Sequence, residues 1–303
     1  MDHKSWMRTV PPETLAALNE TSDRAGLLQL AGHLGAIAVV GAVILAGPPG
    51  WWLLLPVQGV LLVFLFTLLH ETVHFTPFRS RWLNVAAGYL AGGVLLIPPH
   101  WFRYYHLAHH RHTHDPAHDP ELATPKPESW GAYAWYLTGL SVWRSSILTL
   151  FCNAAGRARD PFLPQRARGR VQLEALAMLA FYAGLAACSA LAGSAALLWL
   201  WVVPVILGQP FLRLYLLAEH TRCPHVANMF ENTRTTFTSR AIRWLAWNMP
   251  YHAEHHALPT VPFHRLPALH ALTRPHLKST AEGYTAFHAD YQAALRRARE
   301  AMP

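Results

Sequence analysis

The chain has 303 residues, of which 52% are hydrophobic and only 14% are charged, and its formal net charge is +8. This composition argues against a soluble two-domain protein and favours an integral-membrane protein. The mean hydropathy of +0.14 is modest, which indicates long polar segments between the apolar ones. Cys152, Cys188 and Cys223 stand singly, so we expect neither disulfides nor a cysteine-rich metal site.

In chain order, the first segment is residues 1–26, which is mixed polar and charged. It has no short apolar core followed by small residues, so we expect no cleaved signal peptide. We find no internal repeat, low-complexity tract or clear linker. The sequence therefore predicts one domain over residues 1–303, with a membrane region at 27–218 and a cytoplasmic cap at 219–303.

Four stretches are apolar over the roughly 20 residues that a helix needs to cross a bilayer. We predict an all-α membrane protein in which they form two hairpins. The four predicted spans are Leu27–Ala46, Trp51–Leu69, Val171–Ala192 and Ala195–Ala218.

The connections within the two hairpins, at 47–50 and around Gly193, carry no charge, whereas arginines gather on the opposite side. The positive-inside rule makes that side cytoplasmic, together with both termini. Arginines beside a membrane usually serve topology and contact anionic lipid headgroups. Docking of an acidic electron carrier is a further possibility. No nucleic-acid partner is expected.

Two further apolar segments are poor candidates for spans. Trp82–Ile97 is short, contains Gly88, Gly92 and Gly93, and precedes two prolines, so we predict a shallow or re-entrant hairpin. Gly131–Phe151 is aromatic and is interrupted by Arg144, which favours one amphipathic helix along the interface.

The chain has 20 histidines, and some of them are regularly spaced. His70 and His74 follow the second span at an i,i+4 spacing, which places both imidazoles on one helix face. Alone, such a pair is more often interfacial than metal-binding. His220 stands at the end of the fourth span.

Two clusters repeat the pattern H-x-x-H-H: His106, His109 and His110, then His252, His255 and His256. On a helix we expect the first and fourth histidines to share a face and the fifth to turn by about 100° from the fourth. Adjacent histidines can then serve two different ions, which favours a dinuclear centre.

The predicted ligands are the nine histidines that gather beyond the span ends. They are His70, His74, His106, His109, His110, His220, His252, His255 and His256. Nine imidazoles exceed one zinc ion but fill two sites of four or five ligands.

Neutral imidazoles do not cancel the metal charge, so we expect supporting polar groups around them. The candidates are Glu71, Asp115, Asp119, Glu219, Glu254 and Asn248. Other histidines are expected to be ordinary, and His33, inside the first span, should hydrogen-bond to a neighbouring helix. They include His3, His225, His264, His270, His276 and His288.

We call residues 70–74, 106–110 and 252–256 the first, second and third histidine boxes. These boxes, their order and their flanking motifs resemble the membrane fatty acid desaturase and hydroxylase superfamily, and its bacterial desaturases in particular. The likeness covers roughly Leu69 to His270. The flanking motifs are Ala218-Glu219-His220-Thr221, Asn232-Thr233-Arg234-Thr235-Thr236, Trp247-Asn248-Met249-Pro250-Tyr251, Leu258-Pro259-Thr260-Val261-Pro262 and Arg265-Leu266-Pro267.

The resemblance implies two iron ions on the cytoplasmic face of a four-helix membrane domain, O₂ as co-substrate and a lipid-like substrate. It departs at Leu216, where acyl-CoA desaturases have an asparagine four residues before the single histidine; Asn248 is a candidate for a related role. An acyl-chain desaturase is the first expectation. A hydroxylase or ketolase of a lipid, carotenoid or alkane is the second.

The sequence has no haem, iron–sulfur or nucleotide-binding motif. An external ferredoxin, rubredoxin or cytochrome b5-like electron donor is therefore implied, and a bacterial inner membrane is the expected location. Two other classes stay open: a zinc-dependent membrane hydrolase, and a metal transporter or sensor. A transporter should carry histidines at depth within its spans, whereas these histidines lie beyond the span ends.

Overall fold

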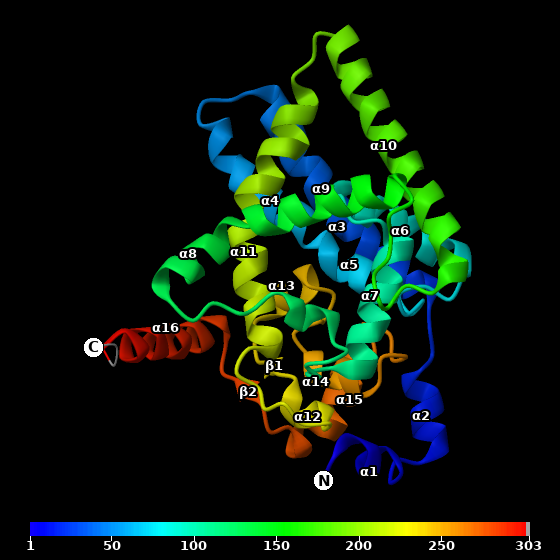
Figure 1. The fold of residues 1–303 in the computed structure, drawn as a ribbon, viewed down its shortest axis with the longest axis vertical. Coiled ribbons are helices and arrows are strands. Elements are labelled where there is room, and N and C mark those ends of the chain that lie inside the picture. The colour runs from blue at the N-terminus through cyan, green and yellow to red at the C-terminus, as the bar shows by residue number, and fades with distance from the viewer. Residues whose placement is uncertain (301–303) are drawn as a thin grey trace.

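A computed structural model describes residues 1–300, and Figure 1 shows that the regular structure of these residues is almost all helix, joined by loops. The elements of the first half are α1 (His3–Met7), α2 (Pro12–Leu18), α3 (Asp23–Ala46), η1 (Trp51–Leu54), α4 (Leu55–Val63), α5 (Leu65–Thr72), α6 (Arg81–Leu95), α7 (Pro99–His112), η2 (Pro120–Ala123), α8 (Trp130–Thr138) and α9 (Leu140–Ala154). Those of the second half are η3 (Gln165–Ala167), α10 (Arg168–Leu191), η4 (Leu198–Val202), α11 (Val203–His220), α12 (Met229–Asn232), β1 (Thr235–Thr236), α13 (Arg240–Leu245), α14 (His252–Ala257), α15 (Leu266–Thr273), η5 (Arg274–His276), β2 (Thr280–Ala281) and α16 (Tyr284–Glu300).

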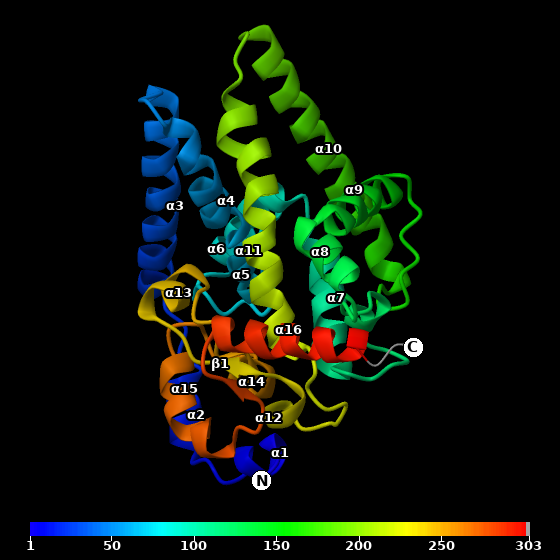
Figure 2. The ribbon, with the colours of Figure 1, turned by 90° about the vertical axis from the view of Figure 1, so that its left-hand side faces the viewer.

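Four helical stretches are long and apolar enough to cross a membrane, which confirms the four predicted spans. They are Pro12–Ala46, Trp51–Thr72, Gln165–Leu191 and Leu198–His220. The turn after α3 and the turn after α10 lie at the same end of the molecule, far from α1 and α2 (Figure 2). Gly47 ends α3 with a left-handed φ of 64°, a conformation that glycine adopts without steric cost.

Close packing of α4 against α11 joins the second and fourth spans. A Cβ on Gly59 would lie 2.0 Å from the Pro204 carbonyl oxygen, and one on Gly208 would lie 2.3 Å from the Gly59 carbonyl oxygen. Only glycine therefore permits this approach, as is common where membrane helices pack without a hydrophobic driving force. The contact fixes α11, whose last residue is His220.

The segment predicted as a re-entrant hairpin is a bent helix pair. Helix α6 has 15 residues, which is roughly 22 Å of helix and too short to cross a bilayer of about 30 Å. Helix α7 leaves it at 95°. At the bend the Ile97 carbonyl oxygen approaches Gly92 so closely that a Cβ on residue 92 would lie 2.4 Å from it, and only glycine leaves room for this approach. The bend directs α7, with three predicted ligands, away from the spans and towards α14 (Figure 2).

The prediction of one amphipathic helix over 131–151 is wrong, because two helices, α8 and α9, occupy this segment. Gly139 separates them with a φ of 66°, and a Cβ there would lie 2.8 Å from the Gln209 Cβ. The close contact with α11 therefore breaks the helix at a residue that can turn. Helix α9 then runs across the direction of the spans (Figure 1).

The segment after α11 folds beneath the spans and holds the third histidine box. Strand β1 pairs in parallel with β2, which ties residue 235 to residue 280. The fully buried Trp247 donates its indole N–H to His33 Nδ1 at 3.2 Å, and His33 Nε2 donates to the Leu61 carbonyl at 2.8 Å. His33 therefore bonds to a neighbouring helix as predicted, and it also links this segment to α3.

Candidate metal centre

Four elements bring the nine predicted histidines together at the ends of the second and fourth spans, with His70 and His220 in the last turns of these spans. His70 lies at the end of α5 and His74 in the turn after it, so the predicted helical pair is divided by the helix end. Helices α7 and α14 contribute three histidines each, and α11 ends on His220. Seven of the nine side chains are buried, while His74 and His110 are half-buried. The structure thus gathers all nine in one interior region.

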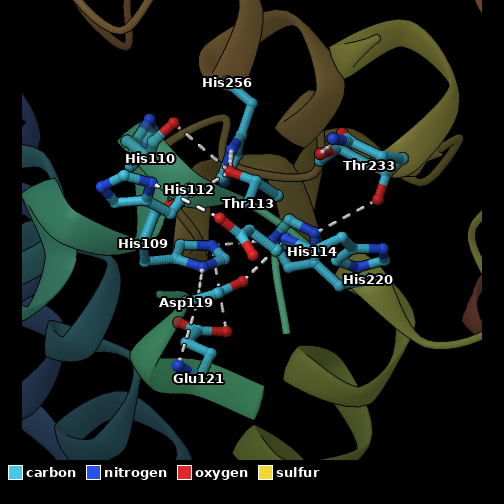
Figure 3. A network of polar contacts seen from close by, with 12 residues as sticks. His109, His110, His112, Thr113, His114, Asp119, Glu121, His220, Thr233 and His256 are labelled. Carbon is cyan, nitrogen blue, oxygen red and sulfur yellow. Dashed lines mark hydrogen bonds and ion pairs between the residues drawn. The ribbon is translucent and has the colours of Figure 1, made fainter. Parts of the chain in front are cut away.

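Two separate groups form within this region. In the first, His70, His106, His110 and His255 each place a ring nitrogen within 4.8 Å of the others; we call it the His255 group. In the second, His109, His220 and His256 do the same; we call it the His220 group. Figure 3 shows the second group with its polar surroundings.

The remaining two histidines each adjoin one group. The His74 ring centre lies 4.7 Å from that of His110 and 4.8 Å from that of His255. His252 Nε2 lies 3.1 Å from His220 Nε2. The nine residues therefore divide five and four, which is enough for two metal sites.

The expected sharing of a face by the first and fourth histidines of each box is wrong. His106 and His110, the first and fifth, belong to one group, while His109 belongs to the other. Box three does the same: His252 adjoins the His220 group with His256, while His255 joins the other. A helix turns about 400° over four residues, which leaves i and i+4 about 40° apart, closer than i and i+3. Adjacent histidines still divide between the groups.

Ring nitrogens in both groups are buried without hydrogen-bond partners among the described residues. Both nitrogens of His70, His110 and His255 are in this state, as is Nε2 of His74, His106 and His256. Each such group costs about 1–3 kcal/mol when left unpaired, so this arrangement needs a compensating ligand. Metal ions bound to these nitrogens would provide it. The donor set therefore fits two metals.

Three Nε2 atoms, those of His109, His220 and His252, converge at this side of the centre. His109 Nδ1 lies 2.9 Å from the Asp119 carboxylate and donates to it. Burial lowers the pKa of His109, but Glu121 and Asp119 outweigh this effect and raise it above the ordinary value. His220 Nδ1 faces the Asn232 carbonyl at 3.5 Å, so its Nε2 is an acceptor. The Nε2 atoms of His109 and His220 are 3.2 Å apart. A ring proton on His109 Nε2 can bridge this distance, and a metal ion bound to both nitrogens would take the place of that proton.

The protonation of box three suits metal binding. Burial, with smaller contributions from neighbouring histidines, lowers the pKa of His252, His255 and His256 well below the ordinary value. Burial and then Arg103 lower the pKa of His74 to about 3. Neutral imidazole is the form that binds metals. No proton therefore has to leave these rings near neutral pH.

Three of the predicted carboxylates lie beside the histidines. Asp119 is buried and holds His109. Glu71 Oε2 lies 4.0 Å from His255 Nδ1, while Glu71 Oε1 accepts the Phe263 backbone N–H at 2.8 Å. Glu219 Oε1 lies 3.6 Å from His252 Nδ1. Each group therefore has a carboxylate at its periphery.

The other three predicted supporting residues lie elsewhere. Glu254 is buried but faces Thr235 and His270. Asp115 forms an outer group with His112 and His118, which is not buried. Asn248 donates to the Phe263 carbonyl at 3.0 Å, and so acts on the segment that binds Glu71.

Sequence reasoning missed two histidines near the centre. His270 was expected to be ordinary, yet its Nδ1 binds Glu254 in the helix of box three. His114 is buried, has a φ of 65°, and places its ring centre 5.5 Å from that of His220. The left-handed backbone at His114 turns the chain back towards the site. The backbone N–H of His114 donates to Asp119 Oδ2 at 2.9 Å (Figure 3). No spacing rule could have placed either residue.

A cavity of about 270 Å³ reaches both groups. Its lining includes His70 and His106 from the first group, and His109 with its neighbour His252 from the second. Aromatic and aliphatic side chains of α5, α7 and α11 form one part of the remaining wall, among them Phe66, Trp101, Phe102, Tyr105, Leu212 and Leu216. Polar and charged residues form the other part, among them Glu121, Lys126, Arg213 and Glu219. Leu216, where acyl-CoA desaturases have asparagine, thus presents an apolar side chain to this cavity.

Comparison with known proteins agrees with this geometry. The family model "Fatty acid desaturase" matches residues 46–288. The Delta(12)-fatty-acid desaturase of Arabidopsis thaliana is 27% identical over 263 residues, which cover 79% of this chain and 64% of the relative. The sn-1 oleoyl-lipid 12-desaturase of Picosynechococcus sp. is 33% identical over 125 residues, or 38% of this chain and 36% of the relative.

A third relative, the Delta(12)-acyl-lipid-desaturase of Punica granatum, is 24% identical over 299 residues and matches 88% of this chain and 74% of the relative. The chain thus spans between about a third and three quarters of the length of these relatives. The family model covers all the histidine boxes and all but the first of the predicted spans. By this match, the chain is a membrane protein that belongs to the fatty acid desaturase family.

Proposed function

We propose that the chain is an O₂-dependent, di-iron desaturase of a lipid acyl chain. The observation that carries this proposal is the cavity whose apolar wall ends on histidines of both groups. An apolar wall suits an acyl chain, and histidines at its end place a hydrocarbon carbon beside both candidate metal sites. The names of the relatives, which specify oleoyl-lipid and acyl-lipid desaturases, support the same substrate class.

The nine histidines would hold two iron ions, five on the side of the His255 group and four on the side of the His220 group. Bound iron would supply the redox chemistry that activates O₂ for cleavage of an unactivated C–H bond. The overall reaction is R–CH₂–CH₂–R′ + O₂ + 2 e⁻ + 2 H⁺ → R–CH=CH–R′ + 2 H₂O. Zinc, the expected metal of a hydrolase, cannot take part in it.

The residues of the chain position the reactants. Phe66, Phe102 and Tyr105 would hold the acyl chain and exclude water, so that one pair of methylenes lies beside the histidines. Asp119 orients His109, and Glu71 and Glu219 place carboxyl oxygens beside the His255 group and beside His252. The chemistry therefore depends on rigid placement by α5, α7, α11 and α14.

Electrons would come from a separate ferredoxin, rubredoxin or cytochrome b5-like protein. A small cavity of about 70 Å³ beside His109 and His220 is lined by Lys126, Arg222 and His225, and offers this donor an approach to the His220 group. The arginine distribution supports a cytoplasmic cap of residues 219–303, two membrane hairpins and both termini in the cytoplasm. We place the protein in a bacterial inner membrane.

The test is production of the chain, with its electron donor, in cells whose lipids contain oleoyl chains. Mass spectrometry of the extracted acyl chains should reveal a new double bond that depends on O₂. A His109→Ala variant should accumulate in the membrane and form no product. A new hydroxyl group in place of the alkene would reassign the reaction to hydroxylation. Turnover without O₂ would overturn the proposal.

A further inference from the structure

We propose that a second cavity, separate from the candidate metal centre, binds the phosphate group of an anionic phospholipid. This cavity measures about 150 Å³ and lies between α6, α7 and the start of α10. Arg81, Arg103 and Arg170, one from each of these helices, line it together with His100 and Tyr89. Three positive side chains thus converge on one small space.

No carboxylate contacts these arginines directly among the described residues, and Glu174 acts on Arg170 only at longer range. None of the three takes part in an ion pair within residues 1–300. Arg103 Nη1 is buried and has no hydrogen-bond partner there. Glu174 lies one turn after Arg170, but its two oxygens accept the backbone N–H groups of His100 and Trp101 at 2.8 and 3.2 Å. The cavity therefore has guanidinium donors without an acceptor.

Phe75 arranges two of these arginines. The guanidinium carbons of Arg81 and Arg103 lie 4.6 and 4.3 Å from the centre of its ring. Phe75 has a φ of 59°, which is costly for an aromatic residue and persists only where the surroundings enforce it. A planar guanidinium fork matches the oxygens of a phosphate, and two forks held by one ring form a preorganised anion site.

The surroundings favour a lipid over a soluble anion. Trp82, Val85, Tyr89 and Leu90 are exposed on α6 and form an apolar, aromatic face beside the cavity. Tryptophan and tyrosine are enriched where a protein meets the headgroup level of a bilayer, and basic pockets between membrane helices bind anionic headgroups. A phospholipid can place its phosphate between the arginines while its acyl chains lie along α6.

This lipid would not be the substrate of the candidate metal centre. The second cavity shares no lining residue with the cavity that reaches the histidines, and Trp101 and Phe102 line that one whereas His100 and Arg103 line this one. The two cavities therefore lie on different faces of α7. A bound phosphate would instead stabilise α7 and the turn at Val73 and Phe75, both of which adjoin predicted ligands.

The experiment uses the full-length protein in lipid nanodiscs made of phosphatidylcholine, into which phosphatidylglycerol is titrated. Bound lipid is measured by native mass spectrometry, so the readout does not depend on activity. The test variant is R81Q/R170Q, because both side chains are exposed and their loss should not prevent folding. The matched control is R166Q/R168Q, which removes two exposed arginines that do not line the cavity.

Each arginine near an anionic surface contributes roughly a fivefold gain in affinity, so R81Q/R170Q should bind phosphatidylglycerol about 25-fold more weakly than wild type. The control should retain its affinity, and R103Q should lose it. Equal binding by R81Q/R170Q and R166Q/R168Q would overturn the site. Displacement of the lipid by millimolar inorganic phosphate would overturn the lipid as its ligand. A loss of donor-driven turnover with unchanged lipid binding would make the surface a protein docking site, contrary to the proposal.

Discussion

The two histidine groups differ in the protein contacts that hold their rings. In the His220 group, Asp119 fixes His109, the Asn232 carbonyl faces His220, and Thr113 Oγ1 lies 3.3 Å from His256 Nδ1. In the His255 group, the rings of His70, His110 and His255 have no such partners. These rings pack on other rings, with 4.1 Å between the ring centres of His70 and His106 and 4.0 Å between those of His110 and His256 of the other group.

This difference indicates that hydrogen bonds orient one group, whereas the other depends on ring packing and on the metal itself. Outer hydrogen-bond partners orient metal ligands and raise their basicity. The His220 group should therefore suffer most from loss of its partners, and the His255 group from loss of a ligand. Five variants test this comparison and the packing around it, from the largest expected effect to the smallest.

His255→Ala should lower turnover by more than about 100-fold, beyond the effect of losing an outer partner, because it removes a ligand from the group with the least other support. Metal content should fall from two ions towards one. The matched control is His118→Ala, in the exposed group with Asp115. Near-normal turnover of the His255 variant would contradict the ligand assignment.

Asp119→Asn should lower turnover about 10–100-fold, because the amide cannot hold His109 in the same tautomer as a carboxylate. Glu71→Gln should cost less, since Glu71 is 4.0 Å from His255. Metal analysis with turnover assays on both variants measures the contrast. A larger defect in the Glu71 variant would reverse the proposed difference between the groups.

Gly208→Ala should strain the α4–α11 contact and thereby displace His220. The new Cβ would lie 2.3 Å from a backbone oxygen, and overpacking of this kind costs about 1–3 kcal/mol. Thermal inactivation in detergent should occur at a lower temperature than in wild type. Gly184→Ala is the control, because a Cβ there meets nothing within 4 Å. Equal stability of the two variants would contradict the tight packing.

Leu216→Asn should change turnover only a few-fold, because His109, His220, His252 and His256 already provide four nitrogens on that side. Its main effect should be a modest loss of stability, because Leu216 is only partly buried on the cavity wall and an amide there loses apolar packing. Leu216→Ile controls for packing in the cavity. A gain or loss above 100-fold in the asparagine variant would show that this position acts on the metal site directly.

Local patterns of the sequence predicted the spans and the convergence of the boxes. Hydropathy located the four helices, because span length is set by the bilayer. The spacing of His252, His255 and His256 predicted a division of adjacent histidines between two groups, because helix geometry is local. These features need no knowledge of distant contacts.

Contacts between distant segments determine the features that the sequence did not predict. Gln209 approaches Gly139 closely, at the residue where the predicted interfacial helix is broken. The local sequence alone predicts one helix, because it contains no sign of this distant neighbour. Glu254 turns to His270 because α15 packs beside α14, and no spacing rule links residues 254 and 270. In each H-x-x-H-H box the first histidine lies beside the fifth, as helix geometry favours, whereas the predicted pairing was between the first and the fourth.

The central claim is a pair of redox-active metals held by these nine histidines. Metal analysis of wild-type protein purified without oxygen, combined with an assay of acyl-chain oxidation, tests it most directly. The account predicts about two irons per chain and product only when O₂ and an electron donor are both present. Stoichiometric zinc with turnover in the absence of O₂ would contradict it.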